Sequence, residues 1–209
     1  MRRNAPWLVL LVVVMLGASG CSEGDSDEPV NLAAACSNPV AGSGPRVYTA
    51  CGTVSGSMVS VDVYGTEVSD EVDGYSLRIS FSPTSFRYVG FALDQNLFGS
   101  ACGQGTVCQD NGSNANTTGE VVLGIDLANS LLPGVVIGNS QRLLARLTFE
   151  AGAVATTTLA LDLAAVPGCV GSSTSGNALH SFDNSCLQGV SVISGVTFSG
   201  GVTLSATAY

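Results

Sequence analysis

The chain contains few side chains of the kinds that carry out acid–base or nucleophilic chemistry. It has a single histidine, His180, in a stretch rich in Gly, Ser and Asn. A Ser-His-Asp hydrolase needs such an imidazole as its general base. No serine stands in the Gly-x-Ser-x-Gly turn that presents a nucleophile in many hydrolases. We therefore expect His180 to be a surface loop residue rather than a catalyst.

The carboxylates also fail to indicate a reaction or a cation site. Glycosidases use two Asp or Glu residues that face each other across the scissile bond, whereas the acidic residues here lie mostly in turns or at outward strand positions. The run DNGSNANTTGEV superficially resembles an EF-hand loop, but Val121 stands where a bidentate Glu is required. The sequence predicts a protein that is not an enzyme and that holds no cofactor or metal.

The cysteines are the remaining reactive side chains, and their number predicts disulfides. Of the 7 cysteines, Cys21 ends the N-terminal apolar segment, and the other six are Cys36, Cys51, Cys102, Cys108, Cys169 and Cys186. Six cysteines in an exported protein allow fifteen pairings. We expect sequence neighbours to pair, as Cys36–Cys51, Cys102–Cys108 and Cys169–Cys186. A zinc site is disfavoured because there is no Cys-x-x-Cys spacing and only one histidine.

The first twenty residues predict an export signal. Arg2 and Arg3 precede a short apolar run at residues 7–16, which is too short to span a bilayer. The following Ala-Ser-Gly-Cys, ending at Cys21, resembles the lipobox of bacterial lipoproteins. That resemblance implies that Cys21 is acylated and that the protein is held at the cell envelope, at the outer membrane in a cell with two membranes. Because the sequence contains no further long apolar segment, we expect the lipid to be the only membrane attachment. An ordinary signal peptide is the alternative.

The exported part of the chain is strongly acidic. The whole sequence has 16 Asp and Glu against 7 cations, all of them Arg, and two of these belong to the signal. No basic stripe is present to bind phosphates, which excludes a nucleic-acid partner. Residues 21–45 are acidic and then rich in Ala, Gly and Pro, which predicts a flexible tether between the lipid and a domain at 46–209.

From residue 46 onward, apolar and polar residues alternate, which predicts strands. Nine segments show the pattern: 47–50, 58–65, 74–82, 86–94, 120–127, 142–150, 156–163, 190–198 and 202–207. The only helical pattern is a short one near 128–132. One apolar face per strand suits two antiparallel sheets packed face to face. Two long polar loops, 96–119 and 164–189, each hold a cysteine pair. They are either recognition surfaces or insertions that a disulfide closes.

Several motifs, taken in order, resemble the cohesin family. Residues 75–91 (YSLRISFSPTSFRYVGF) combine a strand, a Ser-Pro turn and a second strand, and VVLGIDL, RLLARLTFEA, TTTLALDL and TFSGGVTLSA follow downstream. The resemblance spans residues 46–209. It implies an all-β, nine-stranded antiparallel jelly-roll β-sandwich that is non-catalytic and binds dockerins, the calcium-loaded modules of enzymes that assemble on polysaccharides.

The resemblance also implies where a partner would bind, namely the outer face of one sheet. Its strands by order are 74–82, 120–127, 142–150 and 190–198. The outward residues on that face are Ser76, Arg78, Ser80, Glu120, Val122, Asp126, Leu144, Arg146 and Thr148. Many cohesins carry Asn and Asp at the start of the third strand, where this chain has Gly74 and Ser76, and Ser82 replaces the Asp of the family's Asp-Pro turn.

Two other functions remain open from the sequence. A carbohydrate-binding module on a lipid tether, recognising a polysaccharide, would use exposed aromatic residues. The only tryptophan, Trp7, lies in the signal, and Tyr64 and Tyr88 are the tyrosines expected to be exposed. A purely structural envelope lipoprotein is the third hypothesis.

Overall fold

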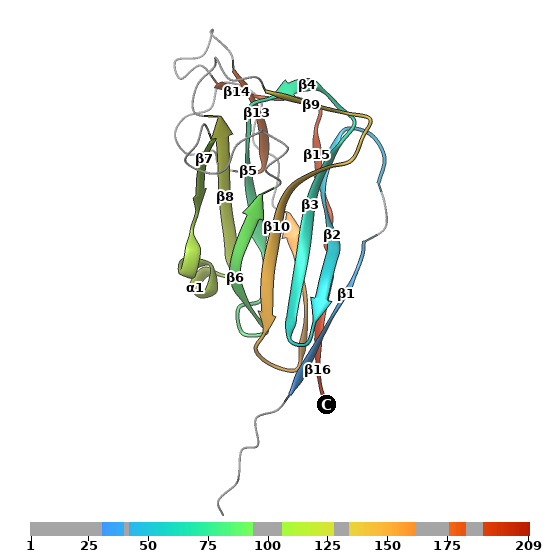
Figure 1. Cartoon of the computed structure of the whole chain (residues 1–209), viewed down its shortest axis with the longest axis vertical. Helices are drawn as coiled ribbons and strands as arrows, with labels where there is room; N and C mark the ends of the chain where they lie inside the picture. The colour runs from blue at the N-terminus through green and yellow to red at the C-terminus, as the bar shows by residue number, and fades with distance from the viewer. Residues whose placement is uncertain (1–30, 40–41, 94–105, 128–133, 162–175, 183–189) are drawn as a thin grey trace, which may run out of the picture.

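The computed structural model of the chain describes residues 31–39, 42–93, 106–127, 134–161, 176–182 and 190–209. These residues form an all-β sandwich whose strand pairs are almost all antiparallel (Figure 1). The predicted fold class is therefore confirmed. The described residues contain sixteen strands rather than nine, because some predicted strands divide in two and several additional short strands lack a clear alternation.

One large sheet, here called the β5 sheet, has six strands in the order β14-β13-β5-β8-β7, with β12 also paired to β5. Its strands are β5 (Gly74–Ser80), β7 (Thr106–Asp110), β8 (Glu120–Leu127), β12 (Ala160–Leu161), β13 (Ala178–Phe182) and β14 (Val190–Val192). Strands β7 and β13 lie within the segments predicted as long loops, so part of each loop belongs to the sheet.

The opposing sheet, here called the β3 sheet, has five strands in the order β15-β2-β3-β10-β6. Its strands are β2 (Arg46–Ser55), β3 (Met58–Thr66), β6 (Phe86–Leu93), β10 (Arg142–Ala151) and β15 (Thr197–Ser199). Strand β15 runs parallel to β2, whereas the other pairs are antiparallel. The predicted strand 190–198 thus divides between the two sheets, as β14 and β15.

Smaller elements complete the described part of the molecule. A three-stranded sheet joins β1 (Leu32–Ser37), β16 (Thr203–Ala208) and β11 (Ala155–Thr158), and a two-stranded sheet joins β4 (Val68–Val72) and β9 (Val135–Gly138). A short turn of helix, η1 (Gly112–Asn114) and α1 (Ala115–Thr118), precedes β8. In Figure 1 the β4–β9 pair lies at the opposite end of the molecule from the C-terminus. The helix expected near 128–132 lies outside the described residues.

Residues 32–37 belong to the fold rather than to the expected tether. Strand β1 pairs with β16 from Leu32 opposite Ala208 to Ser37 opposite Thr203. Ala34 and Leu204 from this pair are part of the buried core. The small alanines of this segment give no strong period-two signal, so the sequence predicts a linker there. The folded domain therefore begins before residue 46.

The core lies between the inner faces of the two large sheets. Inward side chains such as Leu77, Ile79 and Leu123 from the β5 sheet and Leu147 and Phe149 from the β3 sheet are almost completely buried. Burial of such side chains stabilises a fold by about 1.5–3 kcal/mol each. The alternation in the sequence predicted the inward face of these strands correctly.

The Ser-Pro turn between β5 and β6 has the predicted form. The backbone N–H of Ser85 donates to the carbonyl of Ser82 at 3.1 Å, as in a four-residue turn with Pro83 at its second position. Phe81 and Phe86 on either side are buried, and Phe81 packs edge-on against Phe149 with ring centroids 5.3 Å apart. The turn thus anchors both sheets to one aromatic cluster.

Asparagine side chains complete the backbone pairing where strands end. The Asn177 side-chain oxygen accepts from the Arg78 N–H at 2.7 Å, and Asn38 accepts from the Cys51 N–H at 2.6 Å. Asn116 both accepts from the Tyr88 N–H and donates to the Tyr88 carbonyl. Asn111 does the same for β8, accepting from the Val122 N–H and donating to the Glu120 carbonyl.

Candidate functional site

The outer face of β5 and β8 gathers most of the residues predicted to bind a partner. The two strands pair in register, with Ser76 opposite Gly124, Arg78 opposite Val122 and Ser80 opposite Glu120. Because side chains alternate along a strand, these residues point away from the core, and all of them are partly exposed. The structure therefore brings six predicted residues onto one surface: Ser76, Arg78, Ser80, Glu120, Val122 and Asp126.

Strand β7 extends this surface. Val107 stands opposite Asp126 and Gln109 opposite Gly124, so both side chains share the outward face. Val107 is 47% exposed, which is high for an apolar side chain. The sequence prediction missed both residues because β7 is short and lies in a cysteine-containing polar segment. We call the eight residues on β5, β7 and β8 the outer face of the β5 sheet.

Charges on this face are paired across the strands. The Arg78 guanidinium lies 3.5 Å from the Glu120 carboxylate, with 39% and 28% of the two side chains exposed. Exposed pairs of this kind contribute little to stability, usually below 1 kcal/mol. The same face also carries the apolar side chains of Val107 and Val122. Protein interfaces likewise combine charged and apolar side chains.

His180 is buried on this face rather than lying on the surface, which corrects the sequence prediction. It belongs to β13, stands opposite Gly74 and has only 4% of its surface exposed. Its Nδ1 lies 3.0 Å from Asp126 Oδ1, and its Nε2 lies 3.5 Å from Ser76 Oγ. The imidazole thus joins three strands through two polar side chains.

The order Ser76–His180–Asp126 is that of a hydrolase triad, but the surroundings differ in two respects. The Ser76–His180 distance exceeds the reach of 2.6–3.2 Å expected between a nucleophile and its base. Ser76 also lies mid-strand between Gly124 and Ala178, so the neighbouring backbone N–H groups serve sheet pairing rather than an oxyanion. The geometry therefore favours a network that orients Asp126 on the outer face.

Asp126 occupies space that a side chain at position 74 would fill. A Cβ atom on Gly74 would collide with the Asp126 carboxylate. The Asp126 carboxylate on the neighbouring strand therefore occupies the place that a side chain at position 74 would take. The side chain of Asp126 is 49% exposed although His180 beside it is buried, so the carboxylate faces solvent.

Strand β10 does not contribute to this face, which corrects the predicted set. It belongs to the β3 sheet on the other side of the core. A bulge between Leu143 and Ala145 shifts the alternation, so Leu144 is buried rather than outward. Arg146 and Thr148 do point outward, but from the opposite sheet.

Arg146 instead belongs to a polar cluster on the outer face of the β3 sheet. Its Nε and Nη2 donate to Asp62 Oδ1 and Oδ2 at 2.6 and 2.8 Å, and the Tyr64 hydroxyl donates to Asp62 at 3.1 Å. The hydrogen bonds to Asp62 raise the pKa of Arg146. Burial raises the pKa of Tyr64, and the negative charge of Asp62 raises it further. Tyr64 is half-buried, and Tyr88, which we expected to be exposed, is buried.

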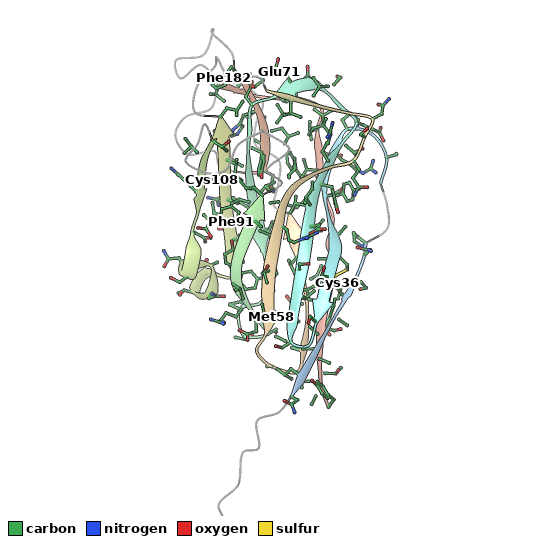
Figure 2. All side chains as sticks on the ribbon, in the orientation of Figure 1. Cys36, Met58, Glu71, Phe91, Cys108 and Phe182 are labelled. Atoms are coloured by element: carbon green, nitrogen blue, oxygen red, sulfur yellow. A yellow bond between two sulfur atoms is a disulfide. The ribbon has the colours of Figure 1, made fainter. Side chains whose placement is uncertain are left out.

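The cysteine prediction is confirmed for one pair. Cys36 on β1 and Cys51 on β2 form a disulfide. Cys108 on β7 is also disulfide-bonded. In Figure 2 Cys36 and Cys108 lie on opposite sides of the molecule. The predicted pairs Cys102–Cys108 and Cys169–Cys186 both involve residues outside those described, as does Cys21.

Neither a metal cluster nor a membrane helix is found among the residues that the structure describes. Within those ranges, His, Cys, Asp and Glu side chains do not gather in threes at a point that could hold a metal ion. In the same part of the chain, no helix has the length and apolar character needed to cross a membrane.

Comparison with known proteins gives matches among solved structures alone. No family model matches the chain, and no curated protein does. The seventh type I cohesin of ScaB from Pseudobacteroides cellulosolvens is 14% identical, with a TM-score of 0.47 over 75% of this chain and 90% of that chain. The third cohesin of ScaC from Acetivibrio cellulolyticus, solved in complex with a dockerin, is 15% identical, with a TM-score of 0.48 over 74% and 94%.

Proposed function

We propose that this chain is a lipid-anchored binding module that recruits a dockerin-like protein through the outer face of the β5 sheet. The module acts by binding and carries out no reaction. The proposal assigns the contact surface to Ser76, Arg78, Ser80, Glu120, Val122 and Asp126, extended by Val107 and Gln109. The lipid on Cys21 and the residues before β1 would hold the module at the cell envelope.

The observation that carries the proposal is the composition of this one face. Adjacent strands present a row of partly exposed polar residues with two valines among them, while their inward neighbours Leu77 and Leu123 are fully buried. A sheet face with a paired charge, a solvent-facing carboxylate and exposed apolar groups suits a protein partner, because protein interfaces combine such groups.

The sequence motifs support the choice of a dockerin-like partner. Residues 75–91, which resemble the cohesin signature, form β5, the Ser-Pro turn and β6. The first of these strands lies at the centre of the proposed face. Where the family motif has polar residues at positions 74 and 76, Asp126 and Ser76 provide the polar groups here, and both contact His180.

Surface plasmon resonance with purified dockerin modules tests the proposal. Immobilised residues 22–209, which lack the lipidated cysteine, should bind at least one calcium-loaded dockerin and release it in EGTA. Arg78→Glu should weaken binding by about tenfold, because reversing an interface charge places like charges against the partner. Failure of every dockerin to bind would contradict the proposal.

Arg87→Glu is the matched control. Arg87 also pairs with a glutamate across two strands, its Nε lying 3.1 Å from Glu150, but the pair is on β6 and β10 of the opposite sheet. This variant should bind the dockerin as the unmodified protein does. Equal losses from both substitutions would indicate a general charge effect and remove the assignment to the β5 sheet.

The anchor is tested independently of the partner. An alkyne-bearing fatty acid fed to expressing cells should label the unmodified protein and leave Cys21→Ser unlabelled. Fractionation should then place the labelled protein in membranes and the variant in the soluble exported fraction. Labelling of the Cys21→Ser variant would show that the lipid is not on this residue.

A further inference from the structure

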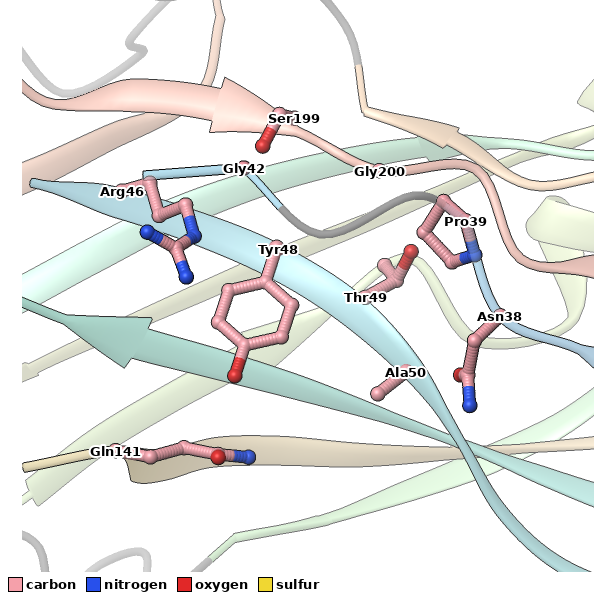
Figure 3. Close-up of a pocket in the computed structure, with 10 residues that line it drawn as sticks. All are labelled: Asn38, Pro39, Gly42, Arg46, Tyr48, Thr49, Ala50, Gln141, Ser199 and Gly200. Atoms are coloured by element: carbon pink, nitrogen blue, oxygen red, sulfur yellow. The ribbon is translucent and has the colours of Figure 1, made fainter. Parts of the chain in front are cut away.

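A pocket opens on the opposite side of the molecule, at the edge of the β3 sheet beside β2 and β15 (Figure 3). It encloses about 260 Å³ and is lined by side chains from β2 and from the segments next to β1, β10 and β15. None of these residues belongs to the outer face of the β5 sheet. The pocket is therefore separate from the proposed partner site.

An aromatic ring, that of Tyr48, is among the groups that line this pocket. In Figure 3 the Tyr48 ring is seen nearly face-on, and the Tyr48 hydroxyl points toward Gln141. The Arg46 guanidinium carbon lies over one face of the Tyr48 ring, 5.1 Å from its centroid, and the centroid of the Tyr64 ring on the neighbouring strand lies 5.8 Å away. Tyr48 thus offers the pocket the part of its ring that Arg46 does not cover, with a polar hydroxyl at one edge.

Polar side chains surround the ring. Arg46, Gln141, Asn38 and Ser199 all line the pocket. Together they offer guanidinium and amide N–H groups, amide oxygens and a hydroxyl, so both donors and acceptors are present. A ligand that stacks on Tyr48 would meet hydrogen-bonding groups along its rim.

The rim is held in place by the fold. Asn38 is fixed by accepting the Cys51 N–H at 2.6 Å, and the Cys36–Cys51 disulfide lies two residues before it. The Arg46 side chain is only 14% exposed, and its Nη1 donates to the Gly44 carbonyl at 3.1 Å. Pre-positioned groups of this kind reduce the ordering that binding would otherwise require.

These features select a class of ligand. A sugar pyranose ring has C–H groups on its faces, which pack on an aromatic ring, and hydroxyls on its rim, which both donate and accept hydrogen bonds. The volume lies just below the range typical for drug-sized ligands, which suits a single sugar unit. The net charge of −9 and the Glu67 carboxylate 3.7 Å from Arg46 disfavour an acidic sugar.

We infer that this pocket binds one neutral pyranose unit of a glycan, with Tyr48 as the stacking surface and Arg46, Gln141 and Asn38 as hydrogen-bonding groups. The inference does not depend on the proposed dockerin-like partner. It would give the module a second ligand on the sheet opposite the partner site.

Ligand-observed saturation-transfer NMR and calorimetry test the pocket with glucose, galactose, mannose, xylose and N-acetylglucosamine. The full chain is purified in a detergent without a sugar head group. At least one of these sugars should bind, and glucuronate or galacturonate should bind more weakly than its neutral counterpart. Binding of none of the neutral sugars, or tighter binding of the acidic ones, would overturn the inference.

Variants of the pocket locate the binding. Tyr48→Ala should weaken binding by about tenfold, which corresponds to roughly 1.4 kcal/mol, whereas Tyr48→Phe, which keeps the ring, should stay within about threefold. Gln141→Ala changes an exposed side chain, so it tests the pocket even if Tyr48→Ala fails to fold. Arg78→Glu on the other sheet should leave sugar binding unchanged. Unchanged binding in Gln141→Ala, or in a folded Tyr48→Ala, would overturn the assignment.

Discussion

The side-chain oxygen of Asn177 lies 2.7 Å from the backbone nitrogen of Arg78 and accepts its hydrogen bond. Along this edge of β5, β13 pairs up to Ser76 and β12 pairs from Ile79, so Asn177 fills the gap between two strands. One completely buried asparagine therefore keeps the edge of β5 paired beside the proposed partner face.

Replacing Asn177 by Ala should lower the free energy of unfolding by about 1–3 kcal/mol, because the partly buried Arg78 N–H would lose its acceptor. Urea unfolding followed by circular dichroism measures the change. Asn114→Ala is the control: that side chain is exposed and makes no capping hydrogen bond, so its effect should stay within about 0.5 kcal/mol. Equal effects of the two substitutions would contradict the role of Asn177.

Replacing Tyr75 by Phe should also destabilise the fold. The Tyr75 hydroxyl donates to the Leu144 carbonyl at 2.7 Å, at the β10 bulge where ladder pairing shifts. Loss of this buried bond between the two sheets should cost about 1–3 kcal/mol in the free energy of unfolding.

Tyr88→Phe provides the comparison for Tyr75→Phe in thermal or urea unfolding. The Tyr88 hydroxyl donates to the exposed Asp110 carboxylate, which water can solvate once the bond is lost. We expect a smaller loss of stability for this variant. A larger loss for Tyr88→Phe would show that the bond across the sheets is not the more important one.

Removing the Cys36–Cys51 disulfide should lower the free energy of unfolding by about 3 kcal/mol, the value expected for a loop of roughly fifteen residues. The double variant Cys36→Ser, Cys51→Ser, unfolded under oxidising conditions, measures this change. Because β1 and β2 would lose their covalent link, hydrogen exchange should accelerate in β1 more than in β8. Uniform acceleration over both strands would argue against a local constraint.

Asp73 should make stability fall as pH rises. Burial raises the pKa of this carboxyl, with the Phe182 N–H lowering it and Glu71 raising it by smaller amounts. The folded state therefore binds the proton more tightly than the unfolded state. Stability linked to Asp73 is fully present below the ordinary value of 3.8 and is lost as pH rises through the raised pKa.

Asp73→Asn checks the direction of this effect. The amide oxygen can still accept from the Phe182 N–H, so the variant removes the charge and keeps the hydrogen bond. Relative to the unmodified protein, it should gain stability at pH 7 and lose that gain near pH 3. Asp70→Asn, at an exposed position on β4, should show no such gain. A gain that is larger at acid pH would reverse the sign and reject the prediction.

The alternation of apolar residues predicted the inward faces of the long strands well. Tyr75, Leu77 and Ile79 on β5 are buried as expected, because the period-two alternation depends only on the residues of the same strand. The period-two pattern reports which side of a strand faces the core, but it does not report which sheet contains the strand. For that reason β10 was placed on the partner face although it belongs to the β3 sheet.

The errors in single residues also have physical causes. Leu144 was expected outward because a strict alternation was continued through a bulge that the sequence does not mark. His180 was expected on the surface because its strand, Ala178–Phe182, is short and lies in a polar segment. The Tyr48 pocket could not be predicted, since it depends on residues from four distant segments that only the fold brings together.

The asparagine side chains that complete the backbone pairing have a further consequence for the proposed lipid-anchored form of the protein. Anchored molecules are concentrated in a plane, where exposed strand edges invite edge-to-edge aggregation. Asn116 occupies both backbone groups of Tyr88 on β6, the outermost strand of its sheet. At that position, the backbone groups with which a strand of a neighbouring molecule would pair are already bonded to Asn116. Edge-to-edge association of crowded molecules is therefore disfavoured at this point.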